Sequence, residues 1–254
     1  AEAAYKKKNY KLAGKFYALV EKNTINMKNR ARSIAMQGVC LSELDKPWQA
    51  FKKYEQALDN FAGYIPFDDV LQREYDLAEA FYKGKRTGFG FFKFSTEDMA
   101  ERIYSHIVKT APYSDLAPKA LYKSGLISLK LENTEGAIEK FRRVRSRYQR
   151  SEVTADARLS LAEALLKAAS NADGDGSLVR EANRELDRFL DRYPDNPNRD
   201  RANELRNQAR EQEAARILAL AEFYLRPAHD RQKAARGYLQ EVVADFPETS
   251  SAAR

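Results

Sequence analysis

The sequence is poor in the residues that build disulfides, metal sites and membrane spans. Cys40 is its only cysteine, which excludes a disulfide within the chain. The two histidines, His106 and His229, lie far apart, and neither has a cysteine or carboxylate at a metal-ligand spacing. No apolar run approaches the roughly 20 residues that cross a bilayer. We therefore predict no metal site, a buried Cys40, and a core or rim position for His106.

The sequence also lacks a set of acids, bases and nucleophiles that would mark an enzyme. The Gly84-Lys85-Arg86-Thr87 segment has neither the upstream glycine nor the preceding strand of a phosphate-binding loop. We predict no catalytic residue and no cofactor. The segment 171–176 resembles the start of a calcium loop, but Ala182 stands at the twelfth position, where a bidentate Glu is needed. A flexible polar loop is expected there.

Glycine (11) and proline (8) are sparse, and strict two-residue alternation is hard to find. Helix formers dominate, so an all-α fold is predicted. Lysine and arginine (44) exceed aspartate and glutamate (37), which gives a net charge of +7. This charge favours acidic partners but fixes no fold. Acidic residues are interspersed and no nucleic-acid recognition module is present, so we predict no nucleic-acid partner.

Residues 116–149 predict two amphipathic helices joined by a polar turn at Glu132-Asn133-Thr134. Gly125 lies in the first helix, where a small residue lets two helices approach closely. Ala137, Phe141 and Val144 line one face of the second helix at the helical period. A small residue followed by this apolar triplet is typical of a tetratricopeptide repeat, which cannot bury its apolar faces alone.

The same triplet recurs along the whole chain. The anchor alanines are Ala13, Ala50, Ala100, Ala137, Ala182 and Ala235. Four residues later come Tyr17, Tyr54, Tyr104, Phe141, Leu186 and Leu239, and seven later come Val20, Ala57, Ile107, Val144, Phe189 and Val242. We therefore predict a right-handed tetratricopeptide solenoid of about five to six repeats. It forms one domain over residues 1–254, with N-terminal repeats at about 1–112 and C-terminal repeats at about 113–254.

Several element boundaries follow from local signals. Gly38 is the small contact residue of the repeat at 30–58, and Asp68-Asp69 suit a helix N-terminus by capping and by the dipole. Ser95 with Asp98 predicts a capping box. A long charged helix is expected at about Arg199 to Leu225. Two insertions, around residues 83–98 and 170–177, separate the helices of their repeats.

The concave face of such a solenoid is lined by first-helix residues, and here they suit an extended peptide. By repeat position these residues are Arg32, Met36, Val39, Tyr75, Tyr82, Lys83, Tyr122, Lys123 and Leu126. Tyrosines offer stacking area and cations can capture a carboxylate. For each residue alone, packing between repeats or solvation is the competing interpretation.

Two further clusters allow either a structural or a binding role. Phe89, Phe91, Phe92 and Phe94 crowd one insertion, where they could anchor a partner or a membrane face, or fold back onto the repeats. Phe91 and Phe92 are the candidate contacts. The second cluster ends one helix and comprises Arg142, Arg143, Arg145, Arg147 and Arg150. It predicts a solvated face, or else a site for an acidic protein or lipid headgroups.

Three repeat endings resemble those of bacterial envelope tetratricopeptide proteins: Ala111-Pro112-Tyr113-Ser114, Arg192-Tyr193-Pro194-Asp195 and Asp245-Phe246-Pro247-Glu248-Thr249. Within that group the chain is similar to the BamD (YfiO) family, the lipoprotein component of the outer-membrane β-barrel assembly machine. The aromatic insertion at 88–92 inside the third repeat and Ala221-Glu222-Phe223-Tyr224 carry the resemblance over nearly the whole chain. The segment 170–177 and the long charged helix depart from the family pattern.

The resemblance implies a non-enzymatic scaffold on the periplasmic face of the outer membrane of a Gram-negative bacterium. A lipidated cysteine upstream of Ala1 would tether it. The N-terminal repeats would receive unfolded outer-membrane protein segments, and the C-terminal repeats, from Ala182 to Ala253, would dock the β-barrel assembly subunit beside other assembly lipoproteins. The alternatives are another periplasmic adaptor for cell-envelope or peptidoglycan machinery and, third, a cytoplasmic repeat protein that binds nucleic acid.

Overall fold

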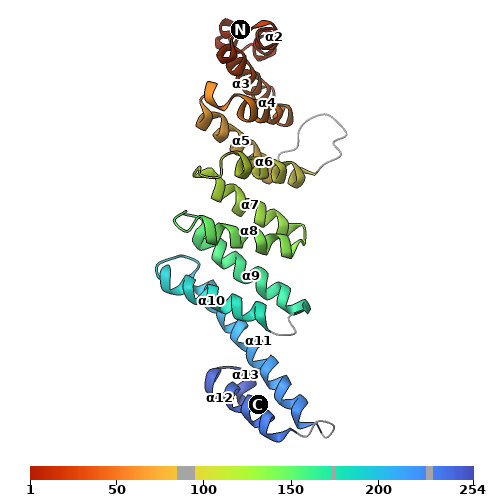
Figure 1. The fold of residues 1–254 in the computed structure, drawn as a ribbon, viewed down its shortest axis with the longest axis vertical. Coiled ribbons are helices and arrows are strands. Elements are labelled where there is room, and N and C mark those ends of the chain that lie inside the picture. The colour runs from red at the N-terminus through yellow and green to blue at the C-terminus, as the bar shows by residue number, and fades with distance from the viewer. Residues whose placement is uncertain (85–94, 173–175, 227–230) are drawn as a thin grey trace. The chain divides into compact units, whose positions relative to one another are not determined.

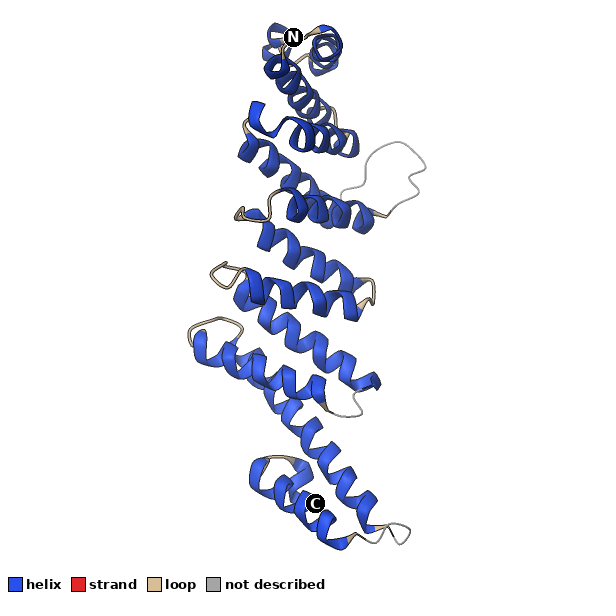
Figure 2. Ribbon diagram, in the orientation of Figure 1, coloured by secondary structure: helices blue, strands red, loops and turns tan. Residues whose placement is uncertain are grey.

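The structure is a computed structural model that describes residues 1–84, 95–172, 176–226 and 231–254, and helices are the regular elements of these ranges. They are α1 (Glu2–Lys6), α2 (Tyr10–Asn23), α3 (Met27–Glu43), α4 (Pro47–Phe61), the 3-10 helix η1 (Ala62–Tyr64), α5 (Phe67–Tyr82), α6 (Thr96–Thr110), α7 (Leu116–Lys130), α8 (Thr134–Arg147), α9 (Thr154–Ala172), α10 (Ser177–Arg192), α11 (Arg199–Leu225), α12 (Gln232–Asp245) and α13 (Ser250–Ala253). Consecutive long helices run back and forth as pairs (Figure 1, Figure 2).

The chain divides into two compact units, Ala1–Ile127 and Ser128–Arg254. Unit 1 contains α1 to α6, and unit 2 contains α8 to α13. The boundary falls within α7. Within each unit every helix packs against the next one along the chain, which is how tetratricopeptide repeats bury apolar faces that a single pair leaves open. That all the repeats form one solenoid stays a prediction.

The repeat register is confirmed by burial. All six anchor alanines are 0% exposed, and the residues four and seven positions later are buried as well, with two exceptions. The exceptions are Val20 and Leu239, at 37% and 38% exposed. The helices that pack on α2 are α3 and the short α1, and those that pack on α12 are α11 and the short α13. Within the described residues, Val20 and Leu239 therefore lie on the two helices that pack on one long helix each. The predicted all-α tetratricopeptide class is confirmed.

Gly38 performs the role that the sequence predicts for it. A Cβ atom at this position would lie 2.4 Å from Cε1 of Tyr54, whose ring is fully buried between α3 and its neighbours. Only glycine allows this approach of helix and ring. The core around it is aromatic and aliphatic, and its largest fully buried side chains in unit 1 include Tyr54, Tyr104, Phe51, Phe81, Ile34, Leu58, Leu71, Ile103 and Ile107.

The helix ends agree with the sequence signals in most places. The Ser95 hydroxyl accepts from the Asp98 amide at 3.1 Å, and the Asp98 carboxylate accepts from the Ser95 amide at 3.0 Å, which confirms the capping box. The capping role predicted for Asp68 and Asp69 is wrong. Pro66 occupies the N-cap of α5, and the two aspartates lie in the first turn, where only their charge favours the helix dipole.

Three of the turns that join helices use a residue in the left-handed region. Lys8, Asp45 and Glu132 have φ angles of 57°, 53° and 60°, and they close the turns before α2, α4 and α8. Glu132 belongs to the polar turn predicted from the sequence. One backbone conformation therefore recurs at the same place in three repeats.

Helix α11 is the long charged helix that the sequence predicts, with the same bounds. Its first half packs against α9 and α10. Its second half carries Ala214, Ile217 and Leu218, which form a separate core cluster with Val242 and Phe246. Helix α11 therefore packs against α9 and α10 on the one hand and against α12 on the other. Among the described residues, no helix is both long and apolar enough to cross a membrane.

Candidate functional site

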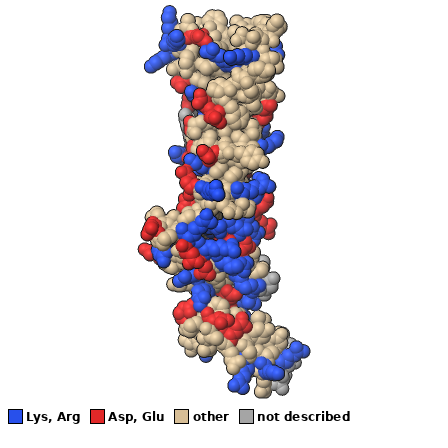
Figure 3. Space-filling view, turned by 60° about the vertical axis from the view of Figure 1, so that its left-hand side comes forward, with Lys and Arg blue, Asp and Glu red and all other residues tan. Residues whose placement is uncertain are grey.

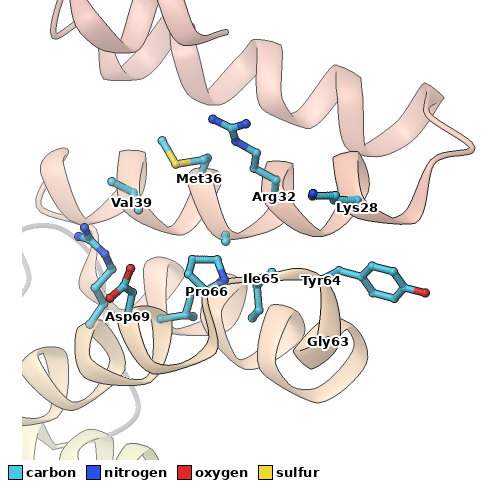
Figure 4. Close-up of a pocket in the computed structure, with 12 residues that line it drawn as sticks. Lys28, Arg32, Met36, Val39, Gly63, Tyr64, Ile65, Pro66 and Asp69 are labelled. Carbon is cyan, nitrogen blue, oxygen red and sulfur yellow. The ribbon is translucent and has the colours of Figure 1, made fainter.

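A groove in unit 1 lies between α3 and the chain that runs from η1 into α5, with a volume of about 700 Å³. Three residues predicted as peptide contacts, Arg32, Met36 and Val39, line its α3 wall. Figure 4 shows Lys28, Arg32, Met36 and Val39 along this helix, and Tyr64, Ile65, Pro66 and Asp69 on the opposite wall. The sequence missed the opposite wall, because Ile65-Pro66 indicated only a chain break.

The groove has an apolar floor and a mostly positive rim. Ala35, Met36, Val39, Ile65 and Val70 provide the apolar lining. Lys28, Arg32 and Arg73 bring three positive charges against the single carboxylate of Asp69. An elongated apolar channel with cations at its edge suits an extended chain that ends in, or carries, a carboxylate.

Arg32 already has a weak partner. Its guanidinium lies 2.8 Å from the Glu2 carboxylate, and both side chains are more than half exposed. Exposed pairs of this kind contribute at most about 1 kcal/mol. A ligand carboxylate could therefore replace Glu2 at little cost, which keeps Arg32 available to a bound segment.

A second group of predicted residues gathers around Glu79 on α5. The Lys123 ammonium lies 3.4 Å from the Glu79 carboxylate and 4.6 Å from the ring centroid of Tyr82. The buried Tyr104 hydroxyl donates to the same carboxylate at 2.5 Å. Burial raises the pKa of Tyr104, and the Glu79 hydrogen bond and charge raise it further. The Tyr104 contact joins the two helices of one repeat, and the Lys123 contact joins α5 to the first helix of the next repeat.

The remaining residues predicted to contact a peptide lie in three different parts of the chain. The Tyr75 ring lies 5.8 Å from that of Tyr104, and Lys83 is an exposed neighbour of Glu79 at 3.8 Å. Tyr122 and Leu126 are half-buried on α7. Phe91 and Phe92 lie outside the described residues, together with the rest of the phenylalanine insertion and the aspartates of the predicted polar loop. That these residues contact a peptide stays a prediction.

His106 is a core histidine, as expected, but the sequence did not reveal its partners. Its Nδ1 lies 2.6 Å from Glu74 on α5, and its Nε2 lies 3.1 Å from Asp59 on α4. Burial alone would lower the pKa of His106, but the hydrogen bonds and charges of Glu74 and Asp59 outweigh it and raise that pKa. The three residues lie on three different helices, and Asp59 and His106 are 47 positions apart in the sequence. No group of side chains in the described ranges could hold a metal ion.

Two arginines of the basic stretch at the end of α8 form ion pairs with another helix, contrary to the sequence-based expectation. Arg142 forms a bidentate ion pair with Glu181, and Arg145 lies 2.9 Å from the buried Glu185. Both glutamates are on α10. The Arg142 hydrogen bond holds the pKa of Glu181 below its usual value. These two arginines are therefore neither a solvated face nor a free binding site. Arg147 and Arg150 are exposed, and Arg143 is half-buried.

Charges of both signs are intermixed on the visible surface. On the face shown in Figure 3, Asp and Glu side chains lie among the Lys and Arg side chains of unit 2 rather than apart from them. No single positive stripe runs over the part of unit 2 seen in this view. That distribution differs from the continuous positive surface that nucleic-acid binding would favour.

The last helix pair of unit 2 carries an exposed apolar edge. Leu239 and Val243 are one helical turn apart on α12, at 38% and 61% exposed. On the inner side of the same helix, Ala235 and Val242 are buried. Leu239 occupies the repeat position that is buried in the other five repeats.

Comparisons with known proteins agree with the sequence resemblance. The family model YfiO, described as outer membrane lipoprotein, matches residues 114–254, which is more than half of the chain. A search of curated proteins finds no match. Among solved structures, the chain is similar to the C-terminal part of a TPR repeat-containing protein from Cytophaga hutchinsonii, at 15% identity over 99% of this chain and 96% of that chain, with a TM-score of 0.37. The family match alone decides the assignment, and the chain belongs to the YfiO family of outer membrane lipoproteins.

Proposed function

We propose that this protein is a non-enzymatic scaffold of outer-membrane β-barrel protein assembly, on the periplasmic face of the outer membrane. The observation that carries the proposal is the YfiO match over residues 114–254. We further propose that a lipid on a cysteine outside this sequence anchors the protein. Its partners are then the β-barrel assembly subunit, other assembly lipoproteins and unfolded outer-membrane protein segments.

The apolar edge of α12 supports docking of the assembly subunit on unit 2. Leu239 and Val243 present adjacent aliphatic side chains that are 38% and 61% exposed. Burying two aliphatic side chains is favourable, and it is the kind of contact that forms the centre of a protein interface. The edge also lies within the C-terminal repeats that the family resemblance assigns to this partner.

The unit 1 groove supports capture of unfolded segments. An unfolded chain offers free backbone groups, apolar side chains and a terminal carboxylate, and the groove offers apolar walls with Lys28, Arg32 and Arg73 at the rim. Nothing in this recognition requires a fixed sequence, which suits a scaffold that receives many different precursors.

The test is capture of partners from detergent-solubilised envelopes of the source bacterium, with identification by mass spectrometry. We expect the full chain to recover the β-barrel assembly subunit, and Leu239→Glu/Val243→Glu to lose it. Tyr113→Glu/Leu131→Glu is the matched control, because it places the same two charges on exposed apolar residues elsewhere. Recovery of peptidoglycan or inner-membrane proteins in place of the assembly subunit would instead support the envelope-adaptor alternative.

A further inference from the structure

One short segment of unit 1 forms the wall of the groove that lies opposite α3. Its lining residues, from Gly63 to Arg73, all fall between Asp59 near the end of α4 and Glu74 in the middle of α5. Both of these carboxylates bond one side chain of α6. The His106 Nε2 lies 3.1 Å from Asp59, and its Nδ1 lies 2.6 Å from Glu74. His106 therefore ties the two ends of the groove wall to each other.

The two ends of this wall are held with unequal strength. At the α5 end Val70 and Leu71 belong to the core, at 3% and 1% exposed. At the α4 end the 3-10 helix η1 buries none of its residues, and the Asp59 side chain is 47% exposed. Among the described residues, His106 is the side chain that bonds Asp59. The η1 part of the wall therefore depends on this contact more than the α5 part does.

Thr110 of α6 shares the same ring nitrogen with Asp59. Its hydroxyl oxygen lies 3.1 Å from Nε2 of His106. In the protonated ring both nitrogens carry a hydrogen, so Nε2 donates to Asp59 while Nδ1 donates to Glu74. In the neutral ring that keeps its hydrogen on Nδ1, Nε2 is an acceptor that takes the hydroxyl hydrogen of Thr110 and cannot bond a carboxylate. Loss of one proton therefore exchanges Asp59 for Thr110.

The remaining neighbours of the ring leave this exchange intact. Beside the two carboxylates that His106 bonds, the charged group that faces the site is Glu55 of α4. Glu55 is already paired with Lys52 at 2.7 Å and with Arg102 at 3.5 Å. Phe51 packs on the ring, with 6.0 Å between the centroids. Burial lowers the pKa of His106, but the hydrogen bonds and charges of its two carboxylate partners raise it above the ordinary value of 6.5.

We propose that His106 is a pH-sensitive switch of the unit 1 groove, which fixes the groove wall when the ring is protonated and releases its η1 end when the proton is lost. The proposal rests on the proposed capture of unfolded segments and adds a control of that same site. A released Asp59 carboxylate can turn to water at little cost, because its side chain is already half-exposed. The fraction of molecules with a binding-competent groove then falls, and the apparent affinity falls in proportion.

The groove itself does not supply a competing pH response near neutrality. Histidine and cysteine are the side chains whose ordinary charge changes lie closest to this range. Neither occurs among the lining residues in the part of the chain that the structure describes. A change of peptide affinity between weakly acidic and weakly alkaline pH is therefore a property of the wall and its support.

The test is fluorescence anisotropy with a rhodamine-labelled, histidine-free peptide of an unfolded outer-membrane protein, from about pH 6 to about pH 9. We expect the 254-residue chain to bind about five-fold more weakly at the alkaline end, the equivalent of one net hydrogen bond. Asp59→Asn should bind equally at both ends, because an amide accepts from the protonated ring and donates to the neutral one. Asp68→Asn is the matched control, since it removes the same charge from an exposed position of the same segment and should keep the dependence.

Thr110→Val tests the exchange of partners at Nε2. It removes the hydroxyl that bonds the neutral ring, so the protonated ring should persist to a pH that is higher by about half a unit to one unit. The imidazole signals of His106 in NMR spectra measure this midpoint without a peptide. His229→Gln identifies them, because the chain has two histidines. A midpoint that is unchanged in Thr110→Val would overturn the exchange.

The methyl signals of Ile65 separate a failure of the switch from a failure of the proposed function. Ile65 lies in the wall, just after η1. Its signals should shift with the midpoint of His106 in the unchanged chain and in Asp68→Asn, and stay fixed in Asp59→Asn. This result without any peptide binding would support the switch and contradict capture by the groove. Ile65 signals that ignore the pH, or a pH-dependent affinity that remains in Asp59→Asn, would overturn the proposal.

Discussion

His106 ties three helices of unit 1 together through its two ring nitrogens. Glu74 on one side is completely buried, and its second carboxylate oxygen has no partner. A neutral imidazole can donate to only one of the two carboxylates, whereas the protonated ring donates to both. The protonated form is therefore the one that satisfies this site, which explains why the pKa of His106 is raised despite its burial.

The stability of unit 1 should fall as the pH rises above neutrality. A raised folded-state pKa means that His106 stabilises fully below its unfolded value, about 6.5, and that this contribution is lost as the pH passes the folded value. Urea unfolding at several pH values, followed by the fluorescence of Trp48, the only tryptophan, measures the effect.

His106→Gln is the variant that isolates this contribution. The other charged groups that face the site are Glu55 and Asp59 from α4, and both remain in the variant. We expect a lower stability at acidic pH and a flatter pH profile. An unchanged slope in His106→Gln would assign the pH dependence to other groups.

Gly38 sets the distance between α3 and the Tyr54 ring, and Gly38→Ala should therefore destabilise unit 1. Overpacking costs about 1–3 kcal/mol, while the better helix propensity of alanine offsets about 1 kcal/mol. We expect a net loss of up to about 2 kcal/mol in the free energy of unfolding, measured by urea denaturation. Gly63→Ala is the control, because a Cβ atom there would have nothing within 4 Å. A neutral Gly38→Ala would show that the ring can move away.

At the level of the helices, α10 is held to α8 and α9 by charge as well as by apolar packing on α9. Glu185 is buried, and it pairs with Arg145 of α8, with Arg158 of α9 and with Arg188 of α10 itself. Arg158 is also buried. A buried charge without its partner is costly, so these residues depend on one another.

Glu185→Ala should therefore cost unit 2 about 3–5 kcal/mol, because it leaves the buried Arg158 uncompensated. Glu163→Ala is the control, since its pair with Arg201 is exposed and is worth at most about 1 kcal/mol. Thermal unfolding by circular dichroism and hydrogen exchange in α8 to α10 measure the two losses. Equal losses in the two variants would mean that the network adds little to stability.

Local patterns predicted the helices well and their long-range polar contacts poorly. The period of the triplets and the Ser95 capping box depend on residues within a turn or two, so the sequence contains them. The Arg142–Glu181 pair spans 39 residues and joins two helices of successive repeats. Nothing in the basic stretch indicates which acidic residue lies opposite, and for this reason its interpretation as a solvated face or binding site was wrong for Arg142 and Arg145.

For the molecule as a whole, the sequence predicted only one wall of the candidate peptide site, the wall formed by α3. Repeat position identifies α3 residues such as Arg32 and Met36, because the register of the repeat sets which side faces outward. The opposite wall comes from η1 and the start of α5, an irregular connection that has no repeat position.

If the two units serve different partners, variants should separate the two activities. Lys28→Glu/Arg32→Glu reverses two charges at the groove rim, and we expect about ten-fold weaker binding of an unfolded outer-membrane protein peptide, by fluorescence anisotropy. Capture of the assembly subunit should persist in this variant. Leu239→Glu/Val243→Glu should give the opposite pattern.

The control for the groove is Lys46→Glu/Lys109→Glu, two exposed lysines of the same unit. It should leave peptide binding unchanged. Loss of both activities in either variant would indicate one shared surface, or a loss of folding that circular dichroism would detect.

Because Cys40 is buried between α2 and α3, the rate at which its thiol reacts can report how often these two helices separate. Its sulfur lies under Ala13 and Tyr17 of α2, and burial raises the pKa of its thiol. A thiol reagent can reach it only when α2 lifts from α3, so the labelling rate counts these opening events. Because Cys40 is the only cysteine among these 254 residues, they already carry a single-site probe of how often α2 separates from α3.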